Sequence, residues 1–133
     1  MGLDNSIEVK RTPKTEHIIE LNRFNLDWDK EHKYDFSVCY WRKCYNIRND
    51  IFNLGLGYDE GEYHLTAQNI DQIIGLLKSY NSKNWQENGG SIWDWDDEKY
   101  PYSEKIQRDI ENLKNLQTLM EKYDLEVYFY DSY

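Results

Sequence analysis

The alternation of hydrophobic and polar positions predicts three strands along the chain. Residues 6–11 alternate so that Ile7 and Val9 share one side of an extended segment, and we expect both to face the core. Residues 35–45 alternate as well, and we expect the rest of the chain to pack around this segment. The third strand covers residues 125–131, with Leu125, Val127 and Phe129 on its apolar side.

A strand period of two residues divides the side chains of residues 35–45 between two faces. One face carries Phe36, Val38, Tyr40, Arg42 and Cys44. The other face carries Ser37, Cys39, Trp41, Lys43 and Tyr45. The first face is therefore apolar as far as Tyr40 and becomes cationic at Arg42.

Apolar residues at intervals of three and four predict two long amphipathic helices. Thr66 is a suitable N-cap for the first helix, which covers residues 67–80. Its apolar stripe is Ile70, Ile73, Ile74 and Leu77. Pro101 and Ser103 open the second helix. Its stripe is Ile106, Ile110, Leu113, Leu116, Met120 and Tyr123.

Two shorter helical segments are expected. Thr15 is a reasonable N-cap for a short helix that contains Ile18, Ile19 and Leu21. Residues 46–52 continue from the central strand as a helical turn, which the glycines at positions 55 and 57 bring to an end.

These elements predict a single α+β domain over residues 1–133, with a small, mostly antiparallel sheet of three or four strands packed against two main helices. A chain of 133 residues is the right length for one core. Aromatic residues make up 16% of the chain, and each can bury about 150–250 Å². We therefore expect an ordered, aromatic-rich core despite a mean hydropathy of -0.95.

The negative net charge limits the kinds of partner that the protein is expected to bind. A net charge of -9 makes the molecule repel nucleic acid and anionic membranes, so no direct nucleic-acid binding is expected and a basic protein is the better partner. No apolar run approaches the roughly 18 residues of a membrane span, and we expect a cytoplasmic protein. Cys39 and Cys44 lie on opposite faces of one predicted strand, which indicates reduced thiols.

Catalytic and metal-binding motifs do not emerge from the sequence. His17, His32 and His64 stand in unrelated contexts, without a nucleophile or a carboxylate at a ligand spacing. The two cysteines lack the Cys-x-x-Cys spacing of a zinc or redox site. We therefore expect a protein that is not an enzyme and uses no metal or cofactor; a hydrolase based on His64 and a nearby acid is the remaining catalytic alternative.

One candidate binding surface is an acidic run that contains aromatic residues. It consists of Trp93, Asp94, Trp95, Asp96, Asp97 and Glu98. Carboxylates interleaved with exposed rings can imitate the phosphates and bases of DNA and thereby fill a basic cleft. The simpler alternative is a solvated loop. We expect this run to form the partner-binding surface of a non-catalytic inhibitor.

The second candidate is an aromatic and cationic group, which supports an alternative function. It consists of Tyr40, Trp41, Arg42, Lys43, Tyr45 and Arg48. Rings can stack on a base while arginines hold phosphate, so this group predicts a small-molecule binding protein or a sponge for a nucleotide signal. The simpler alternative is that Trp41 and Tyr45 fill a core layer while the arginines offset surplus carboxylates.

Three short strings resemble small uncharacterised proteins of phages and prophages from AT-rich bacteria. They are the opening MGLDN, the run YWRKC at residues 40–44 and the ending VYFYDSY. Abundant Lys, Asn, Ile and Tyr, whose codons are AT-rich, agree with such a source. The resemblance implies a small accessory factor that opposes host defence, with a basic host protein as its partner.

Overall fold

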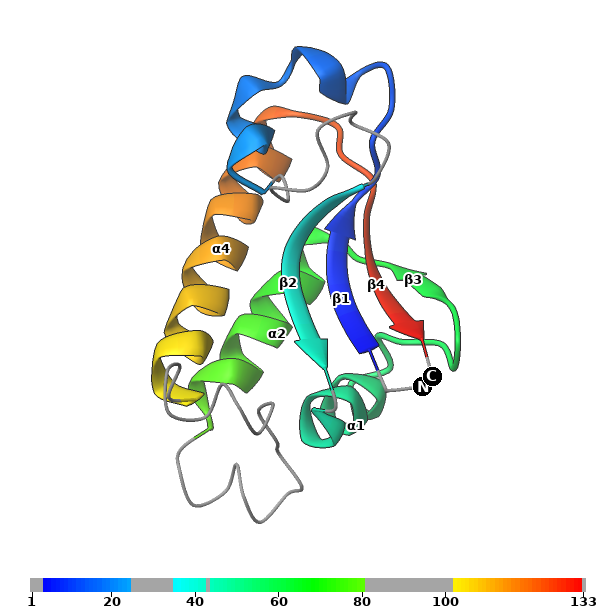
Figure 1. Ribbon diagram of the computed structural model, residues 1–133, viewed down its shortest axis with the longest axis vertical. Coiled ribbons are helices and arrows are strands. Elements are labelled where there is room, and N and C mark those ends of the chain that lie inside the picture. The colour runs from blue at the N-terminus through cyan, green and yellow to red at the C-terminus, as the bar shows by residue number, and fades with distance from the viewer. Residues whose placement is uncertain (1–3, 25–34, 43, 81–101, 133) are drawn as a thin grey trace.

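The computed structural model describes residues 4–24, 35–42, 44–80 and 102–132 (Figure 1). Four strands form an antiparallel sheet in the order β2-β1-β4-β3. The strands are β1 (Asp4–Val9), β2 (Phe36–Arg42), β3 (Glu62–His64) and β4 (Val127–Ser132). The helices are α1 (Tyr45–Asn53), α2 (Ala67–Lys78) and α4 (Tyr102–Lys122), and two 3₁₀ segments are η1 (Thr15–His17) and η2 (Ile19–Phe24). The predicted α+β class is confirmed.

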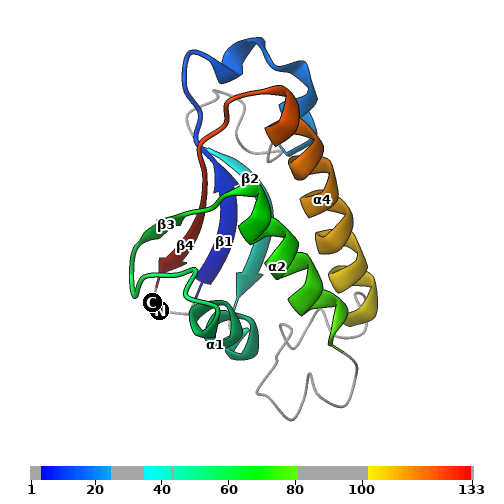
Figure 2. The same cartoon turned by 180° about the vertical axis from the view of Figure 1, so that it is seen from behind.

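The long helices cover one face of the sheet. Figure 1 views the sheet from the side opposite α2, and Figure 2 views it from the side of α2. Helices α2 and α4 pack against each other, and α4 also contacts β2, the edge strand. No helix among the described residues is long and apolar enough to cross a membrane. Figure 1 shows the opposite face of the sheet, over which neither α2 nor α4 lies.

A β-bulge in β2 decides which residues face the helices. Ile7 pairs with Cys39 while the next residue, Glu8, pairs with Ser37, so Val38 is an extra residue without a partner in β1. Asn112 of α4 donates a hydrogen bond from Nδ2 to the Val38 carbonyl at 3.2 Å, which satisfies this interrupted part of the ladder. The bulge therefore joins α4 to the sheet edge.

The predicted division of this strand into two faces is wrong because strict alternation has no place for the extra residue. The buried residues of β2 are Phe36, Val38, Cys39 and Trp41, each at most 3% exposed. Tyr40 lies outward and is 49% exposed. The strand also ends earlier than predicted: Cys44 is the N-cap residue of α1 and Tyr45 is its first residue. Ile47 and Ile51, spaced one turn apart and fully buried, hold this helix against the core.

The two long helices agree with their predicted stripes. Thr66 caps α2 in a capping box, in which its Oγ accepts from the Asn69 amide and the Asn69 Oδ1 accepts from the Thr66 amide. The buried residues of the stripes are Ile70, Ile73, Ile74 and Leu77 in α2, and Ile106, Ile110, Leu113 and Leu116 in α4. Met120 and Tyr123 are partly buried against the same core.

The predicted helix after Thr15 is replaced by η1 and η2. The Thr15 hydroxyl bonds to the amide and carbonyl of Thr12 and caps no helix. Ile18 has an extended conformation between the two segments, which turns Ile19 outward so that it is 78% exposed. Leu21 is fully buried, as expected.

A pair of glycine substitutions tests the packing between α1 and the sheet. A Cβ atom at Gly57 would lie 2.5 Å from Phe52 Cε1 and 3.2 Å from Phe129 Cε2, so Gly57→Ala should lower the unfolding free energy by about 1–3 kcal/mol. Gly75 lies in α2 with nothing within 4 Å of such an atom, so Gly75→Ala should raise it by up to about 1 kcal/mol. Urea unfolding measures both, and equal effects would contradict this packing.

Candidate functional site

The uncovered face of the sheet gathers carboxylates and tyrosines from all four strands. Ile7 and Val9 face the core, so the alternate residues of β1 point outward, together with their partners in β2 and β4. Glu62 of β3 is opposite Tyr130 in the register and joins this side. We name this surface the acidic–tyrosine face, which consists of Asp4, Ser6, Glu8, Tyr40, Glu62, Tyr128 and Tyr130, and Arg42 lies opposite Asp4 at its end.

Two exposed tyrosine rings flank a small residue at the centre of this face. Ser6 of β1 pairs with Tyr40 of β2 on one side and with Tyr130 of β4 on the other. The two tyrosines are 49% and 40% exposed, whereas Ser6 is 5% exposed. Since neighbouring strands lie about 4.8 Å apart, the two rings stand on strands about 10 Å apart. The space above Ser6 is therefore bounded by aromatic side chains.

Hydroxyl groups hold the carboxylates of this face in place. The Ser6 hydroxyl donates to Glu8 Oε2 at 2.5 Å. Tyr128 donates from its hydroxyl to Asp35 Oδ2 at 2.5 Å and lies 3.5 Å from Glu8 Oε1. At the other end of the face, the Tyr40 hydroxyl donates to Asp4 Oδ1 at 2.9 Å. The hydroxyls of Tyr40 and Tyr128 are thus engaged as donors, and the ring of Tyr40, which is 49% exposed, stays available to a partner.

The pKa values of these tyrosines agree with that role as donors. Burial, together with the hydrogen bond to Asp4 and its negative charge, raises the pKa of Tyr40 to about 12. Burial, the hydrogen bond to Asp35 and the charges of nearby carboxylates also raise the pKa of Tyr128. Both phenols therefore stay protonated at neutral pH.

Glu8 is the carboxylate of this face whose pKa is raised. Its burial and the charges of Asp35 and Glu62 raise its pKa, although the hydrogen bonds from Ser6 and Tyr128 offset part of that shift. Within the described parts of the chain no salt bridge reaches Glu8. The nearby ammonium of Lys10 is instead paired with Glu62 at 3.2 Å and lies 5.5 Å from the centre of the Tyr128 ring.

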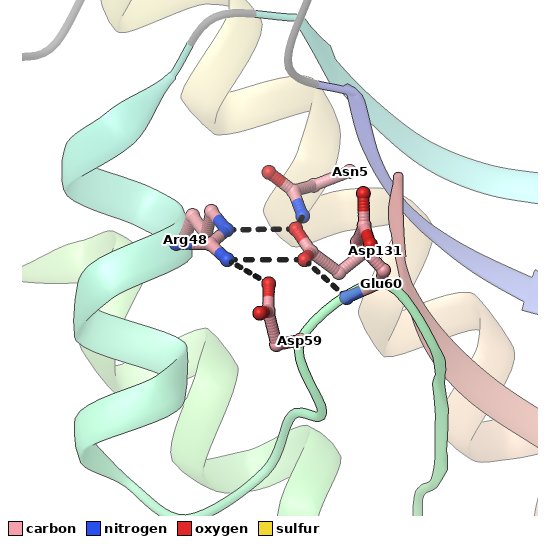
Figure 3. A network of polar contacts seen from close by, with 5 residues as sticks. All are labelled: Asn5, Arg48, Asp59, Glu60 and Asp131. Carbon is pink, nitrogen blue, oxygen red and sulfur yellow. Dashed lines mark hydrogen bonds and ion pairs between the residues drawn. The ribbon is translucent and has the colours of Figure 1, made fainter. Parts of the chain in front are cut away.

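A buried ion pair fixes the turn at Glu60, directly before β3 (Figure 3). Arg48 of α1 donates through Nε to Asp131 Oδ1 at 2.8 Å and through a terminal nitrogen to Oδ2 at 3.1 Å. Asn5 Nδ2 and the Glu60 amide donate to the same carboxylate at 2.6 and 2.9 Å. The Asp131 side chain is fully buried, whereas Asp59, which also pairs with Arg48 at 2.9 Å, is 78% exposed.

This network explains an unusual backbone conformation. Glu60 has a φ of 48°, in the left-handed region of the backbone that residues other than glycine rarely adopt. Its amide is held by Asp131 Oδ2, and the neighbouring Gly61 carbonyl accepts from the Asp131 amide at 2.9 Å. Strand β4 therefore fixes the turn on both sides of this residue, in a segment where Tyr58, Asp59 and Glu60 are exposed.

A second polar cluster is buried under β2, on the side of the helices. Trp41 Nε1 donates to Asp109 Oδ2 at 2.8 Å, and the Lys105 ammonium lies 3.3 Å from the same oxygen. Burial raises the pKa of Asp109, while Lys105 and the indole donor counteract that rise. Burial also raises the pKa of Cys44 to about 12 and that of Cys39 well above its usual value. Both thiols are free and remain protonated at neutral pH.

The structure separates the residues of the predicted nucleotide site. Trp41 is fully buried on the helix side, while Tyr40 is exposed on the opposite side of the sheet. Arg42 is opposite Asp4 on the outer face, and Tyr45 is in α1 and 44% exposed. Arg48 is held by two carboxylates. Lys43 lies outside the described residues. The described members therefore share no pocket, because the sheet lies between Trp41 and Tyr40.

The predicted acidic run of Trp93 to Glu98 lies outside the described residues, and so does His32. His17 and His64 are exposed, on η1 and β3 respectively. Over residues 4–24, 35–42, 44–80 and 102–132, no group of three or more histidine, cysteine or acidic side chains is arranged to hold a metal ion.

Comparisons with known proteins add no family to this picture. No family model matches the chain, and no curated protein or solved structure matches it either. The candidate site therefore rests on its geometry alone.

The acidic–tyrosine face was missed as a unit by sequence reasoning. The alternation in residues 125–131 does place Tyr128 and Tyr130 on the polar side of a strand, which was the available signal. What the sequence lacks is the strand order, which brings these tyrosines beside Ser6 and Glu8, more than a hundred residues earlier in the chain.

Two asparagine substitutions compare the buried and exposed partners of Arg48. Asp131→Asn removes the charge that compensates a largely buried arginine and should lower the unfolding free energy by about 3 kcal/mol at neutral pH. Asp59→Asn affects an exposed carboxylate and should change the unfolding free energy by less than about 1 kcal/mol. Urea unfolding measures both, and similar losses in the two variants would show that burial is not what matters.

The same pair predicts a pH dependence. Burial acts to raise the pKa of Asp131, but the hydrogen bonds from Arg48, the Glu60 amide and Asn5 hold it below the usual 3.8. This contribution to stability is therefore present above the ordinary aspartate pKa and is lost as the pH falls through the lower folded value. The difference between wild type and Asp131→Asn should narrow below about pH 4. A difference in unfolding free energy that stays constant down to acid pH would contradict this prediction.

Proposed function

We propose that this protein is a non-catalytic binding protein that associates with a basic site on another protein through an acidic and aromatic surface. The net charge of -9 favours such a partner, because complementary charge speeds association and selects against acidic surfaces. The observation that carries the proposal is the acidic–tyrosine face. It offers exposed tyrosine rings beside Glu8, a half-buried carboxylate with no salt bridge to any described residue.

The composition of this face is typical of recognition surfaces. Tyrosine is enriched in protein interfaces because a large rigid ring gives contact area at a low entropic cost, while its hydroxyl satisfies a polar neighbour. Tyr40 meets both conditions, because its ring is exposed and its hydroxyl donates to Asp4, and Tyr130 adds a second exposed ring. Glu8 has no salt bridge to any described residue. Because its pKa is raised, its charge lowers the stability of the free protein at neutral pH, and a basic partner would relieve that effect.

The resemblance to phage and prophage proteins supports a host protein as the partner. An accessory factor of this kind would act by stoichiometric occupation of a basic groove, such as one that otherwise binds nucleic acid. The acidic run of Trp93, Asp94, Trp95, Asp96, Asp97 and Glu98 is proposed as a further part of the binding surface. Its contribution is separable from that of the sheet by substitution.

Neutralising the sheet face tests the proposal. In the double variant Glu8→Gln and Glu62→Gln, affinity for a fluorescent oligolysine peptide should fall by roughly tenfold, and its dependence on salt should become weaker. Fluorescence anisotropy at low and high salt measures both quantities. Neutral amides keep the size of the side chains, so the fold should be retained.

The matched control is Glu111→Gln and Glu121→Gln, two exposed positions on α4. It removes the same number of charges from the helix layer and should change affinity by much less. Equal losses in the two double variants would mean that only net charge matters and would remove the sheet face from the proposal. A third variant, with Asp94, Asp96, Asp97 and Glu98 changed to amides, measures the share of the acidic run; no effect there would leave the sheet as the binding surface.

A further inference from the structure

We infer that the acidic–tyrosine face selects arginine over lysine, with a partner's arginine side chain lying above Ser6 between Tyr40 and Tyr130 and its guanidinium directed at Glu8. This inference rests on the proposed function, since it names the side chain through which a basic partner is recognised. The occupant is an arginine-bearing segment of another protein.

The spacing of the two tyrosines suits a flat group. Their strands are about 10 Å apart, with the small Ser6 on the strand between them. A planar guanidinium in contact with a ring on each side needs about 7–8 Å between ring planes, because carbon atoms in contact lie about 3.5–4.0 Å apart. A slight inclination of each ring toward the other brings the two ring planes to this separation. A larger residue at position 6 would fill this space.

The chain already uses the same contact elsewhere. The Arg11 guanidinium lies 3.9 Å from the centre of the Phe36 ring, and that of Arg48 lies 4.4 Å from the centre of Phe52. The Arg23 guanidinium lies 5.7 Å from the centre of the Phe24 ring, similar to the 5.5 Å between the Lys10 ammonium and the centre of the Tyr128 ring, and Lys10 also pairs with Glu62. A delocalised, weakly hydrated guanidinium stacks on aromatic faces more closely than an ammonium does.

The charges around Glu8 favour a cation at this point. Ser6 on its own strand, Tyr128 on β4 and Asp35 before β2 surround it, and Glu62 on β3 adds a further negative charge. Lys10, the cation nearest to Glu8 along the chain, is already paired with Glu62. Ser6 holds one Glu8 oxygen and Tyr128 lies beside the other, so the carboxylate is oriented before any partner arrives. A guanidinium fork can then engage both oxygens.

Paired peptides separate the two cations. Wild-type protein should bind an oligoarginine peptide about tenfold more tightly than an oligolysine peptide of equal length and charge, measured by fluorescence anisotropy. In Tyr40→Leu with Tyr130→Leu this preference should disappear, while oligolysine binding changes little. The control is Tyr45→Leu with Tyr58→Leu, two exposed tyrosines outside this face, which should keep the preference. Circular dichroism shows whether each variant is folded.

A pH titration gives a second readout. Because the pKa of Glu8 is raised, affinity for oligoarginine should rise as the pH increases above the ordinary glutamate pKa of 4.5 and this carboxylate ionises, and Glu8→Gln should flatten that rise. Equal affinity of wild type for the two peptides, or a preference that survives in the Tyr40 and Tyr130 variant, would overturn the arginine inference and leave the proposed function standing. If the wild type binds neither peptide, both fail.

Discussion

The extra residue at Val38 is the constraint on which the rest of the structure depends. A bulge reverses the faces that the following residues of a strand occupy, so it places Trp41 in the core and Tyr40 on the outer surface. Without it, the indole would point to solvent and the outer face would lose one of its two exposed rings. Two residues of α4 bond to this strand: Asn112 donates to the Val38 carbonyl, and Asp109 accepts from Trp41. This helix therefore holds the strand in its bulged form.

The two faces of the sheet then acquire different properties. The helix side is closed by aliphatic residues of α2 and α4, and its buried carboxylate, Asp109, is paired with Trp41 and Lys105. The outer side carries carboxylates that repel one another. Burial and repulsion raise the pKa of Glu8, which means that its negative charge lowers stability at neutral pH. A surface that opposes stability in this way is consistent with selection for binding.

Rigidity is as important to this surface as charge. Asp131 ties together β1, β4, α1 and the turn at Glu60, and all of its side-chain contacts are made inside the fold (Figure 3). The tyrosines of the outer face project from strands on the same sheet. Ring positions that are set in advance lose little entropy on association, which favours recognition by contact. The cysteines lie elsewhere, buried and protonated, and contribute to packing.

The sequence by itself determined the two long helices, their core residues and three of the four strands, because hydrophobic periods of two and of three to four residues are local properties that the chain carries wherever it folds. The net charge of -9 also determined that the surface as a whole would be acidic. Tertiary structure alone decided which residues meet. The bulge that separates Trp41 from Tyr40 depends on contacts with α4, and the grouping of Ser6, Glu8, Tyr40 and Tyr130 depends on the order of strands. Both arise from pairing between distant segments, which no local pattern encodes.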